Sequence, residues 1–299
     1  MTNVYELATA KILELLEKNE NPWTKPWVTR GLNQQKNLSS LRPYTGLNAL
    51  ILAMENQSTD YWLTYKQAQE LGMQVRKGEK SAIVVGWFKS SYKSKDESEA
   101  GEENDGNEPV TKSGLRCRYF RVFNLSQLDN VPATLLEKAK RPEVVPFQTG
   151  TIPAAEQTIE QLNAKINFGV EQACYRPSAD EIFMPDRERF EHVAEFYSTM
   201  FHELGHWTGH SKRLNRLELT KGTMLASKTY SQEELCAEMT SVYVCSSLNI
   251  SSESALRNSS AYIKNWMKFL KDNPKAFVIA CQQGQKAANY ILKGGPVET

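Results

Sequence analysis

The chain has 299 residues, of which 40% are hydrophobic and 24% are charged, the composition of a soluble globular protein. Its net charge of +1 excludes a strong overall electrostatic field, so any affinity for nucleic acid or membranes has to come from a local patch. Its five cysteines are scattered and form no C-x-x-C pair. That usage argues against a disulfide framework and a cysteine-ligated zinc, and it fits a reducing compartment.

No segment of the chain predicts contact with a membrane. The amino terminus, residues 1–20, has the pattern of an amphipathic and partly acidic helix, not of a signal peptide. No apolar run approaches the roughly 20 residues of a membrane span. We therefore expect a cytoplasmic protein, long enough for two domains of ordinary size.

The first part of the chain, residues 1–140, is predicted to be a small α+β domain. Its first twenty positions carry apolar residues at helical spacing, and the proline-rich stretch 21–27 cannot continue that helix. Thr45 and Thr64 are the predicted N-caps of two further helices, the second of which ends at Gly72. The predicted elements are helices at 1–20, 44–54 and 65–71, and strands at 81–88 and 115–123.

An acidic insert separates the two predicted strands. Residues 90–114 are poor in apolar side chains, and residues 96–108 carry seven acidic and no basic side chains. We expect this insert to be a solvated, mobile hairpin.

The second part, residues 151–299, follows a linker at 141–150 that contains two prolines. It is predicted to be mainly helical with a short β-hairpin, so that the whole chain belongs to the α+β class. The predicted elements are helices at 154–164, 190–209, 231–247, 259–271 and 274–292, and a hairpin at 169–185.

An H-E-x-x-H motif lies in the predicted helix at 190–209. Residues i and i+4 share one face of a helix, so His202 and His206 can present two imidazoles to one metal ion. Glu203 lies beside them, placed to take a proton from an attacking water. All four histidines of the chain fall between residues 192 and 210, which favours a metal site over ordinary surface histidines.

The third ligand of such a site has several candidates, because a catalytic zinc site uses three protein ligands and an open position. His210 is one, but the metzincin pattern needs histidine at position 212, where this chain has Lys212. Glu234 and Glu238 are better placed, because they lie at i and i+4 of a later predicted helix and face one side. The competing interpretation is that this pair forms an ordinary exposed acidic helix face.

The glutamate pair resembles the E-x-x-x-D of gluzincin metallopeptidases. By that resemblance Glu234 is the third ligand and Glu238 steadies a ligand histidine, whereas the residues alone leave the reverse open. The candidate metal ligands are therefore His202, His206, Glu234 and Glu238. Histidine and carboxylate ligands favour zinc as the one divalent ion, with manganese or cobalt as alternatives.

The reaction expected of this site is metal-dependent peptide hydrolysis, with Glu203 as the catalytic proton shuttle. Tyr230 and His210 are candidates for a second donor to the developing oxyanion. The predicted strand around Phe183 could receive an extended peptide substrate by strand addition.

The first part also has the composition of a nucleic-acid binder. Up to Lys95 it carries 13 Lys and Arg against 8 Asp and Glu, and its basic residues alternate with aromatic ones. Single-stranded nucleic acid requires stacking platforms beside phosphate-binding cations. The alternative is that the aromatic residues form the core of a small domain. The candidate DNA-binding residues are Trp23, Lys25, Trp27, Arg42, Tyr44, Arg76, Lys77 and Lys80.

Several motifs are distributed over nearly the whole chain, at 22–27 (PWTKPW), 42–50 (RPYTGLNAL), 63–68 (LTYKQA), 75–80 (VRKGEK), 119–124 (YFRVFN), 202–210 (HELGHWTGH), 213–216 (RLNR) and 233–238 (EELCAE). Their combination closely resembles the ArdC antirestriction proteins of conjugative plasmids. The resemblance implies an amino-terminal single-stranded DNA-binding domain, also found in a plasmid-borne TraC-type primase. It further implies a carboxy-terminal zincin-like metallopeptidase domain similar to the Spartan/SprT group.

That resemblance also implies a biological role, the protection of incoming plasmid DNA from the restriction enzymes of the recipient. Its partners would be single-stranded DNA and a protein or peptide substrate, such as a component of a restriction system. The alternative is a DNA-binding antirestriction or primase-accessory protein in which the metal site is structural or regulatory, not proteolytic.

Overall fold

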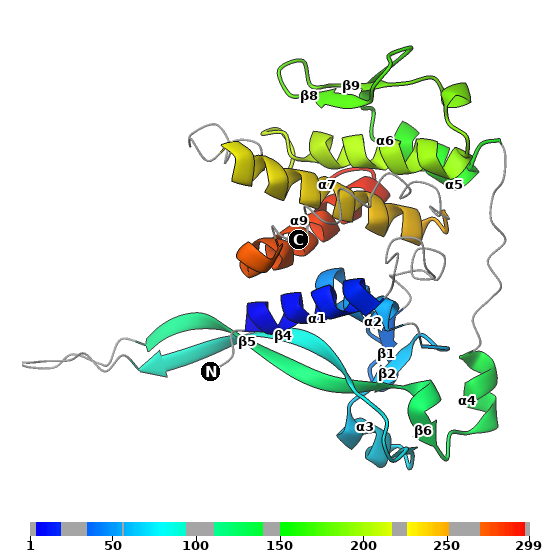
Figure 1. The fold of residues 1–299 in the computed structure, drawn as a ribbon, viewed down its shortest axis with the longest axis vertical. Coiled ribbons are helices and arrows are strands. Elements are labelled where there is room, and N and C mark those ends of the chain that lie inside the picture. Colours follow the sequence, from blue (N-terminus) through cyan, green and yellow to red (C-terminus); the bar gives the residue numbers. More distant parts are fainter. Residues whose placement is uncertain are drawn as a thin grey trace, which may run out of the picture.

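The computed structural model describes residues 4–18, 35–55, 57–93, 111–139, 150–216, 226–250 and 270–296 of the chain. Its architecture is α+β, as the sequence predicts (Figure 1). In these described ranges the strands form a four-stranded, a three-stranded and a two-stranded sheet. None of the described helices is both long enough and apolar enough to cross a membrane.

The first part of the chain supplies the four-stranded sheet, in the order β1-β2-β5-β4, and the two-stranded sheet of β3 and β6. Its helices are α1 (Val4–Lys18), α2 (Gly46–Met54), α3 (Tyr65–Glu70) and α4 (Ala133–Lys138). Its strands are β1 (Lys36–Asn37), β2 (Tyr61–Leu63), β3 (Gln74–Val75), β4 (Ala82–Lys93), β5 (Thr111–Asn124) and β6 (Leu128–Asp129).

The predicted helix caps differ in their chemistry. Thr64 caps α3 with a complete capping box: its hydroxyl accepts from the Gln67 N–H at 3.2 Å, and the Gln67 side chain accepts from the Thr64 N–H at 2.9 Å. Thr45 occupies the predicted N-cap position of α2, but its side chain makes no capping hydrogen bond. The sequence therefore predicts the N-cap position of both helices correctly, but only Thr64 forms the capping hydrogen bond.

Strands β4 and β5 form a long antiparallel ribbon that reaches beyond the helices (Figure 1). Their pairing runs from Ala82 opposite Val122 to Lys93 opposite Thr111. Regular strand therefore continues into both ends of the predicted insert at 90–114. The remainder of that insert, 94–110, lies outside the described residues.

The second part contains the three-stranded sheet and the longest helices. Its helices are α5 (Pro153–Glu160), α6 (Val193–Thr208), α7 (Ala226–Ser247) and α9 (Pro274–Leu292), and its strands are β7 (Lys165–Phe168), β8 (Cys174–Arg176) and β9 (Glu181–Met184). The hairpin of β8 and β9 was predicted, whereas β7, which pairs parallel to β9, was not. The predicted helix at 259–271 lies outside the described residues except for its last two positions.

Helix α9 joins the two parts of the molecule, because it lies between α7 on one side and α1 and α2 on the other (Figure 1). Gly284 permits the approach to α7, since a Cβ at this position would lie 2.8 Å from the Cβ of Met239. On the opposite side, the Gln285 side chain accepts from the Gly46 N–H at 2.9 Å, and the Thr9 hydroxyl donates to the carbonyl of Pro274 at 2.9 Å. One buried apolar cluster contains side chains from α1, α2, α6, α7 and α9. The helices that carry the candidate metal site are thus packed on the same core as the first part.

Candidate metal centre

Helix α6 presents both motif histidines to α7. The Nε2 atoms of His202 and His206 lie 3.1 Å apart, as expected for residues i and i+4 that point at one position. The other side of the helix is held in the core by Phe201 and Leu204, which are fully buried. Gly205 lies between the histidines, and a Cβ there would be 3.0 Å from the Cα of Ala237. The glycine of the motif therefore lets α7 come close enough to bring carboxylates to the imidazoles.

Glu234 on α7 lies between the two histidines. Its Oε2 is 3.5 Å from Nε2 of His202, and its Oε1 is 3.5 Å from Nε2 of His206. In a tetrahedral site with metal–ligand bonds of about 2.0–2.1 Å, donor atoms are about 3.3 Å from one another. The three side chains thus have the spacing, and the nitrogen and oxygen donors, that a divalent ion of the zinc type requires. Among the described residues, they are the group of histidines, cysteines and acids with donors close enough to share an ion.

Each histidine also faces a second carboxylate through its other ring nitrogen. Glu238 Oε1 lies 3.5 Å from Nδ1 of His202, and Glu233 Oε1 lies 3.5 Å from Nδ1 of His206. A carboxylate at Nδ1 fixes the orientation of the ring and leaves Nε2 for a metal. The structure therefore brings the predicted residue Glu238 to the back of His202, and not into the group formed with Glu234. Glu233 has the equivalent place at His206 and was not predicted.

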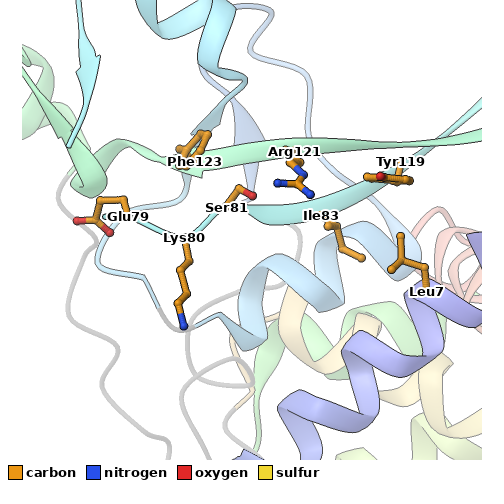
Figure 2. A pocket seen from close by; sticks show the side chains of 8 residues that line it. All are labelled: Leu7, Glu79, Lys80, Ser81, Ile83, Tyr119, Arg121 and Phe123. Atoms are coloured by element: carbon orange, nitrogen blue, oxygen red, sulfur yellow. The ribbon is translucent and has the colours of Figure 1, made fainter. Parts of the chain in front are cut away.

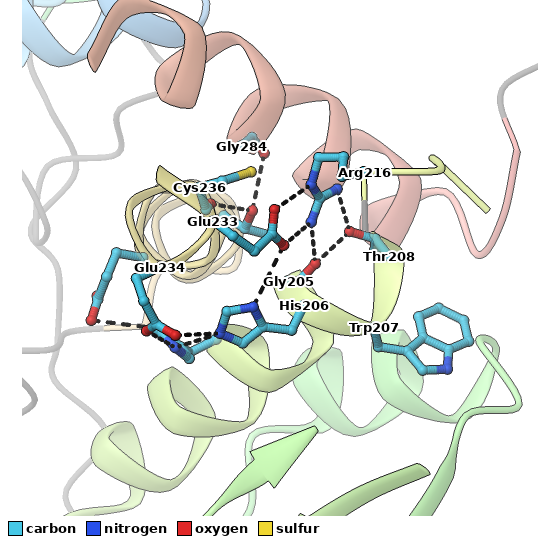
Figure 3. Close-up of polar contacts among 12 residues, drawn as sticks. Gly205, His206, Trp207, Thr208, Arg216, Glu233, Glu234, Cys236 and Gly284 are labelled. Atoms are coloured by element: carbon cyan, nitrogen blue, oxygen red, sulfur yellow. Dashed lines mark hydrogen bonds and ion pairs between the residues drawn. The ribbon is translucent and has the colours of Figure 1, made fainter. Parts of the chain in front are cut away.

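Glu233 is itself held by a buried arginine (Figure 3). Arg216 is 6% exposed, and its guanidinium donates to both carboxylate oxygens of Glu233, at 2.9 and 3.1 Å. It also donates to the Thr208 hydroxyl at 3.0 Å and to the Gly205 carbonyl at 2.6 Å. These acceptors belong to the last turn of α6, where carbonyl groups lack partners within the helix. One cation thus closes the end of α6 and connects it, through Glu233, to His206.

The charges of the site shift the pKa values of its members. Burial alone would lower the pKa of His202, but the negative charges of Glu238, Glu234 and Glu203 raise it to about 9. Burial raises the pKa of the Glu203 carboxyl, and it outweighs the opposing effects of both histidines and of a backbone hydrogen bond from Tyr175. A carboxylate with a raised pKa is a stronger proton acceptor, which suits the role predicted for Glu203.

Strand β8 borders the site on the side of Glu203. The backbone of its residue Tyr175 lies close enough to the Glu203 carboxylate to lower its pKa, and the Tyr175 hydroxyl donates to Asp180 at 2.9 Å. Arg213 links the same Asp180 to α6, because its guanidinium donates to that carboxylate and to the Trp207 carbonyl, the latter at 2.6 Å. The turn between β8 and β9 is therefore tied to the end of the motif helix.

The prediction that the strand around Phe183 receives a substrate strand is wrong. Phe183 belongs to β9, which is the central strand of its sheet and is paired on both edges, with β7 and β8. No edge of β9 is left for a further strand. In the described part of the sheet, β8 is an edge strand, and it is the one that borders Glu203.

The two candidates for an oxyanion donor have different outcomes. His210 is not part of the group around Glu234: its Nδ1 accepts from the Lys212 N–H at 3.3 Å and lies 3.8 Å from an oxygen of Asp180. Tyr230 belongs to α7, but its side chain lies outside the described residues.

The residues predicted to bind DNA are placed unevenly. Trp23, Lys25 and Trp27 lie outside the described residues. Arg42 and Lys77 are exposed, whereas Tyr44 is partly buried against a cluster that contains Trp62. Trp62 is 1% exposed and donates through Nε1 to Gln35 at 2.6 Å, so at this position the core interpretation of the aromatic residues holds.

Two more of the predicted DNA-binding residues come from the turn that precedes β4. Arg76 is occupied by intramolecular bonds, to Glu79 at 2.9 Å and to the carbonyls of Ser126 and Leu128. Lys80 lines a hollow of about 470 Å³ between the β4–β5 ribbon and α1 (Figure 2). Its lining combines the cations Lys80 and Arg121 with two aromatic rings and one carboxylate; the residues are Leu7, Glu79, Lys80, Ser81, Ile83, Tyr119, Arg121 and Phe123.

Comparison with known proteins identifies both parts of the chain. Residues 2–123 match the N-terminal domain of anti-restriction factor ArdC, and residues 153–283 match a zincin-like metallopeptidase family. The chain is 33% and 32% identical to two DNA primases TraC of Escherichia coli over 96% of its own length, but it spans only 20% and 27% of theirs. It is 32% identical to an uncharacterized protein of Sinorhizobium fredii, with 97% of the chain and 92% of that protein covered.

Solved structures show the same similarity in three dimensions. The antirestriction ArdC protein from the R388 plasmid, in its metal-free form, superimposes with a TM-score of 0.77 at 30% identity. The Mn(II)-bound form of that protein gives a TM-score of 0.70. Both alignments cover 98% of this chain and 97% of the other.

Proposed function

Because this chain belongs to the ArdC family of antirestriction proteins, we propose that it binds single-stranded DNA and carries a metal-dependent peptidase site, and thereby protects incoming plasmid DNA from host restriction. The observation that carries the peptidase proposal is the position of Glu234, whose two oxygens lie 3.5 Å from the Nε2 atoms of His202 and His206. The donor atoms of His202, His206 and Glu234 converge there. The buried carboxylate of Glu203 lies next to them, on the same helix as the two histidines.

In this mechanism His202, His206 and Glu234 hold the ion, and Glu238 and Glu233 hold the imidazoles in place. The bound ion supplies Lewis-acid polarisation of the scissile carbonyl. Glu203 accepts a proton from the attacking water and passes it to the leaving nitrogen. The backbone of Tyr175 orients the Glu203 carboxylate for that transfer.

Zinc is the proposed ion, because two imidazoles and one carboxylate form a common zinc ligand set. Manganese is the alternative that the relatives favour, since the R388 ArdC protein has a solved Mn(II)-bound form. Metal content of the purified protein, measured element by element, distinguishes them.

The DNA-binding proposal rests on the match of residues 2–123 to the ArdC N-terminal domain and on the exposed cations of that part, such as Lys77 and Arg121. Phosphate contacts release counterions, so the affinity for a fluorescent oligonucleotide should fall steeply as salt is raised. A salt-independent affinity contradicts electrostatic binding.

A second function is favoured by the similarity to the TraC primases. This chain matches only a fraction of the length of those proteins. In it, DNA binding alone protects the plasmid or assists priming, and the metal site stabilises or regulates the protein. The two functions differ in the need for the proton shuttle Glu203.

The deciding experiment is plasmid transfer into restricting and non-restricting hosts with the Glu203→Gln variant, which keeps the size of the side chain. The matched control is Glu195→Gln, at the other glutamate of α6. Loss of protection by Glu203→Gln with normal metal content and normal DNA binding supports the peptidase. Full protection by Glu203→Gln, together with loss of protection by His206→Ala, indicates a structural metal.

A further inference from the structure

The inner and middle part of the β4–β5 ribbon exposes two phenyl rings among the described residues. Phe88 on β4 and Phe120 on β5 are 45% and 39% exposed, and their ring centroids lie 5.8 Å apart at an interplanar angle of 64°. On the same face, Val84, which pairs with Phe120, and Val122 are buried, so the exposed apolar surface begins at this pair and continues outward to Phe88. Exposed neighbouring aromatic rings on a strand ribbon are a typical surface for stacking ligands.

A glycine holds the rings together. Gly86 has no side chain, and a Cβ at this position would lie 2.8 Å from Phe120 Cε2 and 3.1 Å from Phe88 Cζ. Both rings therefore lean over the backbone of Gly86, where any other residue would push them apart. A ring above a glycine also stabilises a sheet, but one ring is sufficient for that. Here two rings lie above the same glycine, and part of the surface of each ring is exposed to solvent.

The charge around the rings is exclusively positive within the ribbon. Its two strands contain six Lys and Arg residues, two in β4 and four in β5, and no Asp or Glu. Gly86 pairs with Arg118, so the side chain of Arg118 lies on the face of Phe88 and Phe120, and it is exposed. An apolar surface on two strands that carry cations and no acids is complementary to bases that are linked by phosphates.

Resting on the proposed DNA binding, we infer that Phe88 and Phe120 form a platform on which bases of single-stranded nucleic acid stack, while Arg118 holds an adjacent phosphate. A duplex cannot use this platform, because its bases are already stacked on one another. The hollow that contains Tyr119 and Arg121 opens on the opposite face of the ribbon, since successive strand residues alternate between faces (Figure 2). The platform is therefore a separate site from that hollow.

The test measures the affinity of the full chain for a fluorescent single-stranded oligonucleotide and for the same sequence as a duplex. Phe88→Ala and Phe120→Ala should each weaken single-strand binding about 5- to 150-fold, the range for the loss of one stacked base. Their duplex affinity and salt dependence should stay unchanged. Phe88→Tyr and Phe120→Tyr keep the rings and should bind like the wild type. Arg118→Ala should reduce the salt dependence by about one phosphate contact.

The matched control is Phe168→Ala on β7, because Phe168 is an exposed phenylalanine of the second part, at 54% exposure. It should leave DNA binding intact. If both alanine variants bind single strands as tightly as the wild type, the platform is overturned while the DNA-binding proposal stands. If the wild-type chain itself has no affinity for single strands at low salt, the proposed function is overturned. Loss of self-association or of protein binding, with single-strand affinity retained, shows that the surface is a protein interface and also overturns the platform.

Discussion

The ion pair of Arg216 and Glu233 allows a quantitative test of how the end of α6 is stabilised. Arg216 is 6% exposed, and the side chain of Glu233 is 13% exposed, so both charges are largely removed from water. Breaking such a pair by removing one partner leaves an uncompensated buried charge and costs about 3–5 kcal/mol. We therefore expect Arg216→Met to lower the free energy of unfolding by this amount, and Glu233→Leu to lower it by about 3 kcal/mol.

The double variant Arg216→Met/Glu233→Leu removes both charges of this pair, so neither is left without its partner. It still loses the hydrogen bonds from Arg216 to the Gly205 carbonyl and the Thr208 hydroxyl, each worth about 1 kcal/mol. Its expected cost is therefore about 2 kcal/mol, below that of either single variant. The coupling energy between the two positions should be several kcal/mol, far above the roughly 0.5 kcal/mol within which independent sites add.

Urea unfolding followed by tryptophan fluorescence measures these free energies. The control cycle is Lys66→Met with Glu70→Leu on α3, an exposed pair at 3.7 Å for which we expect a coupling below about 0.5 kcal/mol. If the two single effects at Arg216 and Glu233 simply add in the double variant, the account of a buried, mutually neutralising pair is refuted.

Two further predictions follow from the same region and from the adjoining helix α5. Glu238→Ala should weaken metal binding about 10- to 100-fold, as expected for a carboxylate that orients a ligand, whereas Glu234→Ala should abolish binding at comparable metal concentrations. Metal titrations of the metal-free protein measure both affinities. Equal losses in the two variants would contradict the distinct positions of the two glutamates. Glu156, although burial opposes it, has a lowered pKa because Tyr197 and Arg187 donate to its carboxylate. Its stabilising effect is present above the ordinary glutamate pKa of about 4.3 and is lost as pH falls through the lower folded value. Glu156→Gln should therefore be less stable than the wild type at pH 7, and the difference should shrink as pH falls below the ordinary glutamate pKa; a difference that stays the same throughout an acid titration would count against this linkage.

The parts of the site that were predictable from the sequence are those that local geometry determines. His202 and His206 are one helical turn apart, and a helix must bring them to the same face. The cap of α3 by Thr64 depends on Gln67, three residues away, and was equally predictable from the sequence. In each case the information lies within a few residues of the chain.

The residues that were not predictable depend on contacts between distant segments. Glu233 is linked to His206 through α7, and its partner Arg216 lies seventeen positions before it, beyond a stretch outside the described residues. Both residues occur in the motifs at 213–216 and 233–238, and their opposite charges were the available signal. Phe88 and Phe120 meet only because the register of β4 and β5 places them on either side of Gly86. Trp62, an aromatic residue of the first part, is buried in the core, which is the alternative that the sequence left open for these aromatic residues.

The contact between the first and the last described helices bears on how the two parts of the chain are held together. Tyr5 of α1 lies under Lys275 at the start of α9, at 5.9 Å, and Thr9 donates to the carbonyl of Pro274, so the first described helix packs on the beginning of the last one. In the TraC primases the region that matches nearly the whole of this chain is a fifth to about a quarter of the length, so both parts occur together there within a longer protein. A fragment cut between the two parts would, by contrast, expose the apolar faces of α1 and α2 that α9 covers, so the pair of parts is expected to be inherited, expressed and transplanted as one piece.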